Sequence, residues 1–116
     1  METLQFSNPV WKPGNNVTIR LGTKWSTKVK PGDIVHLPNF ALGFIKEIRI
    51  VYLGNLESSF LQLEHDPKCR TWEGLVTVLK EVYPELANLD GEGLENTIVT
   101  AIIFNPYLAI EHGSSR

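Results

Sequence analysis

Residues 17–21 constrain the fold most, because apolar and polar side chains alternate along them. In an extended chain the two kinds would point to opposite sides, Val17, Ile19 and Leu21 against Asn16, Thr18 and Arg20. This two-residue period predicts a β-strand with one face in a core. The strand would hold a hydroxyl and a guanidinium at fixed spacing, and a guanidinium can grip a phosphate or a base edge through two hydrogen bonds. A merely solvated polar face is the alternative.

Three more strands are predicted along the chain. The segments 34–37 and 44–53 are rich in β-branched and aromatic residues, and a Pro-Gly turn precedes the first of them. The run 97–104 is apolar on both faces, which is typical of a central strand. Loops are expected at 22–30 and 87–96, where polar residues and glycines gather.

One principal helix is predicted over residues 71–83. Thr71 can cap its first turn, and Pro84 ends it. Its apolar residues recur at helical spacing: Trp72, Leu75, Val76, Leu79 and Tyr83. A shorter helical turn is expected within 56–63, with Phe60 and Leu63 turned inward.

Charge is divided unevenly along the chain, although the net charge of 116 residues is only -2. Between residues 3 and 32 there is no acidic side chain, whereas between 81 and 115 there is no Lys or Arg. This asymmetry predicts a basic face and an acidic face. A basic patch is typical of a phosphate-bearing partner. The basic half contributes Lys24 and Lys28 on either side of Trp25, which could stack on a base or only anchor its loop.

Composition is that of a globular protein, with 42% hydrophobic and 21% charged residues. The longest apolar run, 98–104, is too short to cross a bilayer, and no secretory leader is recognised. The single cysteine, Cys69, cannot form an internal disulfide. We therefore expect a cytoplasmic protein of one domain with no membrane partner.

The segment 64–70 is the second candidate site, because six of its seven side chains ionise. Glu64, His65 and Asp66 could act as acids or bases, and Lys68 and Arg70 could contact a nucleic acid. Cys69 could act as a nucleophile if its basic neighbours lowered its pKa. Adjacent side chains rarely converge on one ion, so no metal is expected here. A lone strand histidine, His36, is more often structural.

The order of these elements resembles the ASCH domain family, which has the PUA-like fold. The matching pieces span most of the chain: Val17-Thr18-Ile19-Arg20, Lys30-Pro31-Gly32-Asp33, Lys80-Glu81-Val82-Tyr83-Pro84 and the run 98–104. The resemblance implies an α+β, mainly β fold, a small PUA-like β-barrel of about five or six strands with the helix 71–83 at its side. It also implies a cleft for a nucleotide or RNA. The domain would cover residues 1–110, followed by a flexible tail at 111–116.

Some members of that family are amidohydrolases of acetylated cytidine. In them a threonine on this strand is the implied nucleophile, and Thr18 stands at its position. The assisting lysine falls on Asn15, which has no basic nitrogen. The assisting glutamate falls within 66–69, where the simplest alignment supplies Lys68, with Glu64 and Asp66 nearby.

Three functions follow from these observations. The first is a module that binds RNA or a modified nucleotide, with Arg20 on a phosphate or base edge. In this module Asn16, Thr18, Lys24, Trp25, Lys28, Lys68 and Arg70 would supply further contacts. The second is an enzyme using the same cleft, either an amidohydrolase or a ribonuclease, with Thr18, Glu64, His65 or Asp66 in catalytic roles. The third is a protein-interaction scaffold. None of them requires a cofactor, and the oligomeric state stays open.

Overall fold

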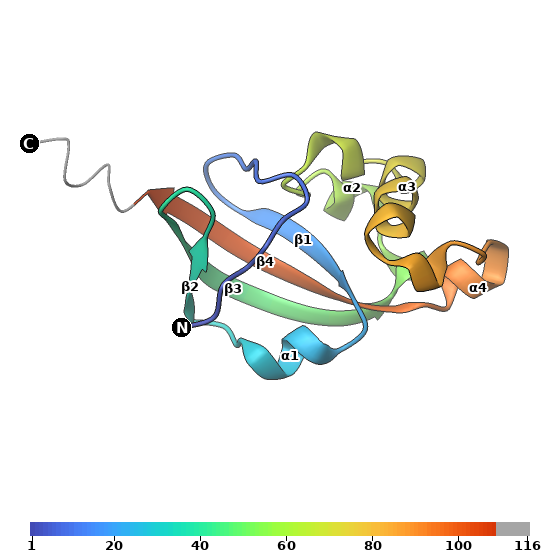
Figure 1. Cartoon of the computed structure of the whole chain (residues 1–116), viewed down its shortest axis with the longest axis horizontal. Helices are drawn as coiled ribbons and strands as arrows, with labels where there is room; N and C mark the ends of the chain where they lie inside the picture. Colours follow the sequence, from blue (N-terminus) through green and yellow to red (C-terminus); the bar gives the residue numbers. More distant parts are fainter. Residues whose placement is uncertain (109–116) are drawn as a thin grey trace, which may run out of the picture.

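The structure is a computed structural model that describes residues 1–108. Four strands, β1 (Asn16–Leu21), β2 (Ile34–Leu37), β3 (Ala41–Tyr52) and β4 (Ile98–Leu108), form one sheet in the order β1-β4-β3-β2. Every neighbouring pair is antiparallel. The two long strands, β3 and β4, run across the middle of the molecule (Figure 1).

Helical segments lie on both sides of this sheet. Two short helices, α1 (Lys24–Lys28) and α2 (Ser58–Leu61), precede the longest one, α3 (Trp72–Val82), and α4 (Gly91–Glu95) follows it. Single 3-10 turns connect them: η1 (Leu53–Asn55), η2 (Pro67–Cys69) and η3 (Pro84–Leu86). Thr71 caps α3 by accepting a hydrogen bond from the Gly74 N–H, and Pro84 follows the last turn. No helix within residues 1–108 is long and apolar enough to cross a membrane.

The sheet separates two hydrophobic clusters, because the side chains of β1 alternate as the sequence predicts. Val17 and Ile19 pack against the layer that contains Leu75 and Leu79 of α3. The other cluster lies under the N-terminal segment and α1, and its buried members are Leu4, Val29, Val35, Leu37, Ala41, Ile45, Ile102 and Phe104. Apolar residues facing both clusters make β4 the doubly buried central strand.

Both edges of the sheet are extended by single bridges. Thr3 pairs in parallel with His36 of β2, and Glu64 pairs in parallel with Val17 of β1. The Phe6 and His65 rings then meet edge to face with centroids 4.7 Å apart, so side chains connect the two added segments. No ladder within residues 1–108 joins β1 to β2, and the four-stranded sheet is therefore open.

The predicted α+β class, the helix and all four strands are confirmed, with shifts at their ends. β3 begins at Ala41 instead of residue 44, and β4 continues to Leu108 instead of ending at 104. Two predicted loops are wrong, because α1 and α4 form inside them. In the turn at 56–63, Leu61 is the fully buried residue, whereas Phe60 and Leu63 are partly buried. The predicted tail, 111–116, and the domain end at 110 lie outside the described residues.

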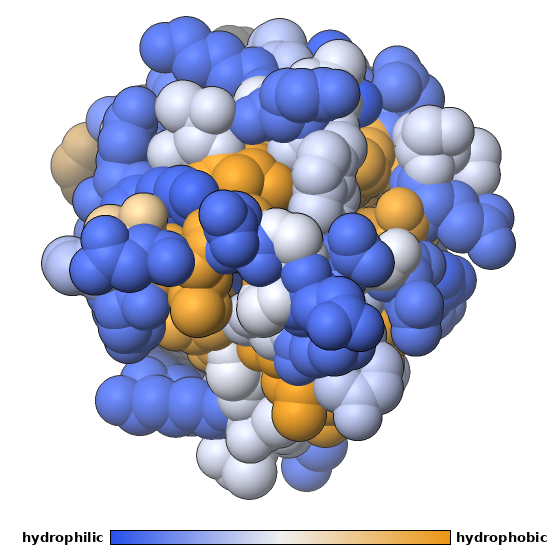
Figure 2. Space-filling model, turned by 90° about the vertical axis from the view of Figure 1, so that its right-hand side faces the viewer, coloured by the Kyte–Doolittle hydropathy of each residue, from blue (hydrophilic) through white to orange (hydrophobic). Residues whose placement is uncertain are grey.

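The charge asymmetry of the sequence persists in three dimensions. Lys24 and Lys28 are exposed on α1, on one side of the sheet. The acidic side chains between residues 73 and 95 are exposed on α3, η3 and α4, at another end of the molecule. Hydrophilic residues cover most of this end, with apolar residues reaching the surface between them (Figure 2). The two charged regions are therefore separate surfaces.

Candidate functional site

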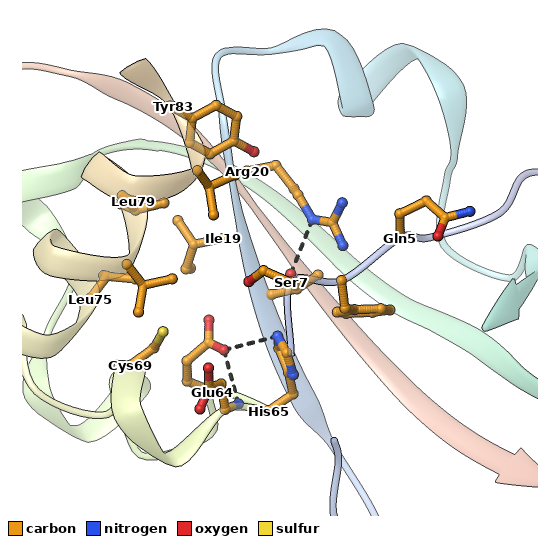
Figure 3. A pocket seen from close by; sticks show the side chains of 15 residues that line it. Gln5, Ser7, Ile19, Arg20, Glu64, His65, Cys69, Leu75, Leu79 and Tyr83 are labelled. Carbon is orange, nitrogen blue, oxygen red and sulfur yellow. Dashed lines mark hydrogen bonds and ion pairs between the residues drawn. The ribbon is translucent and has the colours of Figure 1, made fainter. Parts of the chain in front are cut away.

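A small pocket lies beside the outer edge of β1 and brings the two candidate sites of the sequence together. Its volume is about 70 Å³, which is room for a few water molecules or for one edge of a ring. Thr18 and Arg20 of β1 line it together with Glu64, His65 and Asp66. Arg20, Glu64 and His65 are labelled in Figure 3. The remaining walls come from the N-terminal segment and α3: Gln5, Phe6, Ser7, Ile19, Cys69, Leu75, Val78, Leu79, Val82 and Tyr83.

The pocket begins where the parallel pairing of β1 stops. Val17 donates its N–H to the Leu63 carbonyl at 2.8 Å and accepts from the His65 N–H at 2.9 Å. The chain then turns away at Asp66 and Pro67, which start η2. Backbone groups on a strand alternate in direction, so the N–H and C=O of Ile19 point to the same outer edge as those of Val17. Ile19 therefore offers a backbone donor and a backbone acceptor to the pocket.

Arg20 is held in place by one hydrogen bond and two aromatic rings. Its Nε donates to Thr18 Oγ1 at 3.1 Å. The guanidinium carbon lies 5.0 Å from the centre of the Phe6 ring and 5.5 Å from that of Trp25. Such cation–π contacts fix the orientation of a cation without using its N–H groups. Burial is the main reason that the pKa of Arg20 lies below its usual value.

The Arg20 Nη2 atom is buried and has no hydrogen-bond partner among the described residues. Within residues 1–108 no other side-chain nitrogen or oxygen that is fully shielded from solvent lacks one. Leaving a buried donor unpaired costs roughly 1–3 kcal/mol, and more for a charged group. A native site that keeps such a cost is a candidate for binding an acceptor.

Glu64 and His65 form a second polar centre on the opposite wall of the pocket. The carboxyl oxygen Oε1 of Glu64 lies 3.3 Å from His65 Nε2 and also accepts the Asp66 N–H at 3.1 Å. Burial raises the pKa of Glu64 to about 8. Burial also lowers the pKa of His65. Both shifts favour the uncharged forms of the two groups.

Comparisons with protein families, curated proteins and solved structures find no match. The chemistry available here is that of the lining groups, which include donors in Arg20 Nη2 and the Ile19 N–H and acceptors in the Ile19 carbonyl and Glu64. No group of three His, Cys, Asp or Glu side chains within residues 1–108 is arranged to hold a metal ion.

Asp66 lines the pocket, but its carboxylate is used in hydrogen bonding within the charged segment 64–70. Its carboxylate accepts the Lys68 N–H at 3.0 Å and caps η2. Arg70 donates from Nε to the backbone oxygen of Glu64 at 3.0 Å, which closes the segment on itself. Gly74 lets α3 approach this turn, because a Cβ there would collide with the Lys68 carbonyl oxygen. Lys68 and Arg70 are not among the residues that line the pocket.

Asn16 shares the polar face of β1 but lies outside the pocket. It is fully buried, and its side-chain amide donates to the carbonyls of Lys12 at 2.7 Å and Gly14 at 3.1 Å. Its Oδ1 accepts the Lys12 N–H at 3.1 Å. All of its strong hydrogen-bonding groups are thus used to hold the turn before β1.

Trp25 lies between Lys28 of α1 and Arg20 of the pocket. This ring is partly buried against the second cluster, so it anchors α1 to the sheet. Lys28 Nζ lies 4.6 Å from the centre of the ring, and the Arg20 guanidinium lies 5.5 Å from it. A strip of alternating cations and rings therefore runs from Lys28 through Trp25 and Arg20 to Phe6. Lys24 is exposed, and no contact joins it to this strip among the described residues.

Several residues that line the pocket could not be recognised from the sequence. Phe6 carries no signal of a site in the sequence, and Tyr83 was expected only as part of the helix stripe. Their roles depend on how the N-terminal segment folds over β1 and where α3 ends. Cys69 is also in the wall, but burial raises the pKa of its thiol to about 12. The hypothesis of an activated cysteine is wrong, because burial outweighs the neighbouring Lys68.

A wider groove of about 580 Å³ adjoins the pocket and shares Ser7, Asp66 and Val78 with it. Its charged lining is mainly acidic, with Glu73 and Glu81 of α3 beside Asp66 and Lys68. A polyanion leaving the pocket would be repelled here and attracted by the lysines of α1. The groove and the surface of α1 thus differ in sign of charge.

Proposed function

We propose that this protein binds RNA or a modified nucleotide, with a base edge or a phosphate oxygen held in the pocket by Arg20. The observation that carries the proposal is the buried, unpaired Nη2 of Arg20. An acceptor atom of a ligand would satisfy this donor and recover the free energy that its burial costs. Arginine is also the side chain best suited to planar, two-point contacts with bases and phosphates.

The mixed lining supports a nucleotide over a simple anion. Beside the guanidinium, Ile19 offers a backbone N–H and a backbone carbonyl on the same edge, and base edges carry donors and acceptors side by side. A pocket of about 70 Å³ would take one edge of the ligand and leave the rest outside. The strip from Arg20 through Trp25 to Lys28 would then lead the phosphates toward α1.

We further propose that the chain is an ASCH domain with a PUA-like barrel. The order of its strands and helix supports this, as do the two parallel bridges that extend the sheet at both edges. Counting the segments around Thr3 and Glu64 would give six strands, with the Phe6 and His65 rings meeting at the seam. The polar face of β1 would then form one wall of the cleft expected in such a barrel.

An enzyme acting on the same ligand class is the second candidate, and a specific observation favours it. Glu64 and His65 share the pocket with Thr18, and their protonation is shifted by burial. Groups with such shifts gather at catalytic sites. Against catalysis, Thr18 Oγ1 is engaged by Arg20, and the exposed Asn15 supplies no base to activate the hydroxyl.

The test is binding of short labelled single- and double-stranded RNA and DNA at two salt concentrations, with the intact oligonucleotide followed over time. The wild type is compared with Arg20→Met, which keeps the length of the side chain and removes the guanidinium. Arg49→Met is the matched control, because Arg49 is exposed on β3, paired with Glu47 and stacked on Phe60.

The expected result is salt-dependent binding that Arg20→Met weakens at least about tenfold, as the loss of one charged hydrogen bond predicts. Arg49→Met should bind like the wild type. Shortening of the RNA by the wild type alone would favour the enzyme. Equal binding by the wild type and Arg20→Met would contradict the proposed site, and absence of binding to all four nucleic acids would contradict the RNA form of the proposal.

A further inference from the structure

A hydrogen bond between Glu64 and His65 needs a hydrogen on one of the two facing atoms, Glu64 Oε1 or His65 Nε2. Both residues are buried, with 2% and 8% of their surfaces exposed. Glu64 Oε1 and His65 Nε2 lie 3.3 Å apart. In Figure 3 the carboxyl and the ring face each other across this gap, at the foot of the pocket.

The tautomer of His65 follows from its other nitrogen. Nδ1 lies 2.8 Å from the backbone oxygen of Val10. A carbonyl oxygen can only accept a hydrogen bond, so Nδ1 must carry a hydrogen. In a neutral ring Nε2 then has none, and its lone pair points at Glu64. A carboxylate oxygen there would place two acceptors against each other, which is unfavourable in a buried site.

We propose that Glu64 and His65 hold one proton between them at neutral pH, carried on the Glu64 carboxyl, and that His65 positions this un-ionised carboxyl toward the ligand. Val10, through its carbonyl, fixes the tautomer of His65 and so makes Nε2 the acceptor. The inference rests on the proposed function only in taking this pocket as the ligand site. The protonation state itself is a property of the free protein.

The surroundings decide which partner carries the proton. Burial lowers the pKa of His65 most, and the charges of Arg20 and Lys12 lower it further, whereas the hydrogen bond to Val10 and the charge of Asp66 raise it. Burial raises the pKa of Glu64 to about 8 with a smaller contribution from the charge of Asp66, and it outweighs the Asp66 N–H bond and the charges of Arg20 and Arg70, which lower this pKa. A neutral ring beside a protonated carboxyl is therefore favoured over an ion pair of imidazolium and carboxylate.

The proton has a consequence for the ligand. A carboxylate at this point would repel a phosphate or a carbonyl oxygen bound to Arg20, whereas a neutral carboxyl would not. As long as Glu64 stays protonated, the positive charge of the Arg20 guanidinium is not offset by a carboxylate, and the pocket attracts an acceptor group of the ligand. Ligand affinity should accordingly fall as the pH rises past about 8.

The test is a pH titration of the free protein by NMR, with nitrogen-labelled histidine and carbon-labelled glutamate. At neutral pH we expect His65 to carry a hydrogen on Nδ1 and none on Nε2, and the Glu64 carboxyl to be protonated. The carboxyl should lose its proton in a single step near pH 8. His36, which is exposed on β2, is the internal control for a solvated ring.

Two variants distinguish the effect of the His65 ring on Glu64 from the effect of burial alone. In the wild type the nitrogen signals of His65 should also change when Glu64 loses its proton near pH 8, and Glu64→Gln should abolish this change. His65→Phe keeps a ring and removes both nitrogens, so Glu64 should lose its proton at lower pH than in the wild type, because its acceptor is gone. A hydrogen on Nε2 at neutral pH in the wild type would overturn the proposal, as would an unchanged Glu64 midpoint in His65→Phe. Neither readout depends on RNA binding, so the proposed function can fail independently.

Discussion

At the scale of single residues, two asparagines that are neighbours in sequence should respond very differently to mutation. Asn15 is exposed, whereas Asn16 is fully buried and makes three hydrogen bonds to the backbone of Lys12 and Gly14. Asn16→Ala leaves these groups unpaired inside the protein, and we expect it to lower the free energy of unfolding by about 2–3 kcal/mol. Asn15→Ala should change it by less than about 0.5 kcal/mol. Urea denaturation of both variants measures the difference, and equal stabilities would show that the buried amide does not hold the turn.

At the scale of elements, the hairpin between β2 and β3 carries a conformation that its sequence does not favour. Asn39 and Phe40 have φ values of 64° and 63°, and Phe40 is 84% exposed. Glycine adopts this left-handed conformation without steric cost, whereas phenylalanine does not. We expect Phe40→Gly to stabilise the protein by up to about 1 kcal/mol, visible as a higher midpoint of thermal unfolding. Asn39→Gly is the control and should gain less, since asparagine tolerates this region. A lower midpoint for Phe40→Gly would mean that the ring makes a contact worth more than the strain.

At the scale of the whole molecule, periodicity predicted the sheet and the helix, because burial of one face imposes a period of two residues on β1 and of 3.6 on α3. The short helices α1 and α4 were missed, since five residues contain too little of a period to distinguish a helix from a loop. Thr18 and Arg20 were identified by chemistry and alternation. Their meeting with Glu64 and His65 was not readable from the residues, because it depends on a bridge between Val17 and Glu64 that joins distant segments.

Burial of Glu64 and His65 should make the free energy of unfolding depend on pH. The folded-state pKa of Glu64 is raised to about 8, and that of His65 is lowered from 6.5. Above pH 6.5 the unfolded chain has lost the proton of His65 as well as that of Glu64, whereas the folded pair keeps one proton until about pH 8. The folded state binds more protons in this window, so stability falls as the pH rises through it.

The loss should reach at most about 2 kcal/mol, which is 1.36 kcal/mol for each of the roughly 1.5 pH units involved. Urea denaturation at a series of pH values between 6 and 9 measures it, with Glu64→Gln as the comparison. The glutamine cannot release a proton, so this variant should keep its stability across the window in which the wild type loses it. A wild type whose stability is flat, or rises, between pH 6.5 and 8 would mean that Glu64 is already ionised in the folded protein, and the pocket would then hold a carboxylate opposite Arg20.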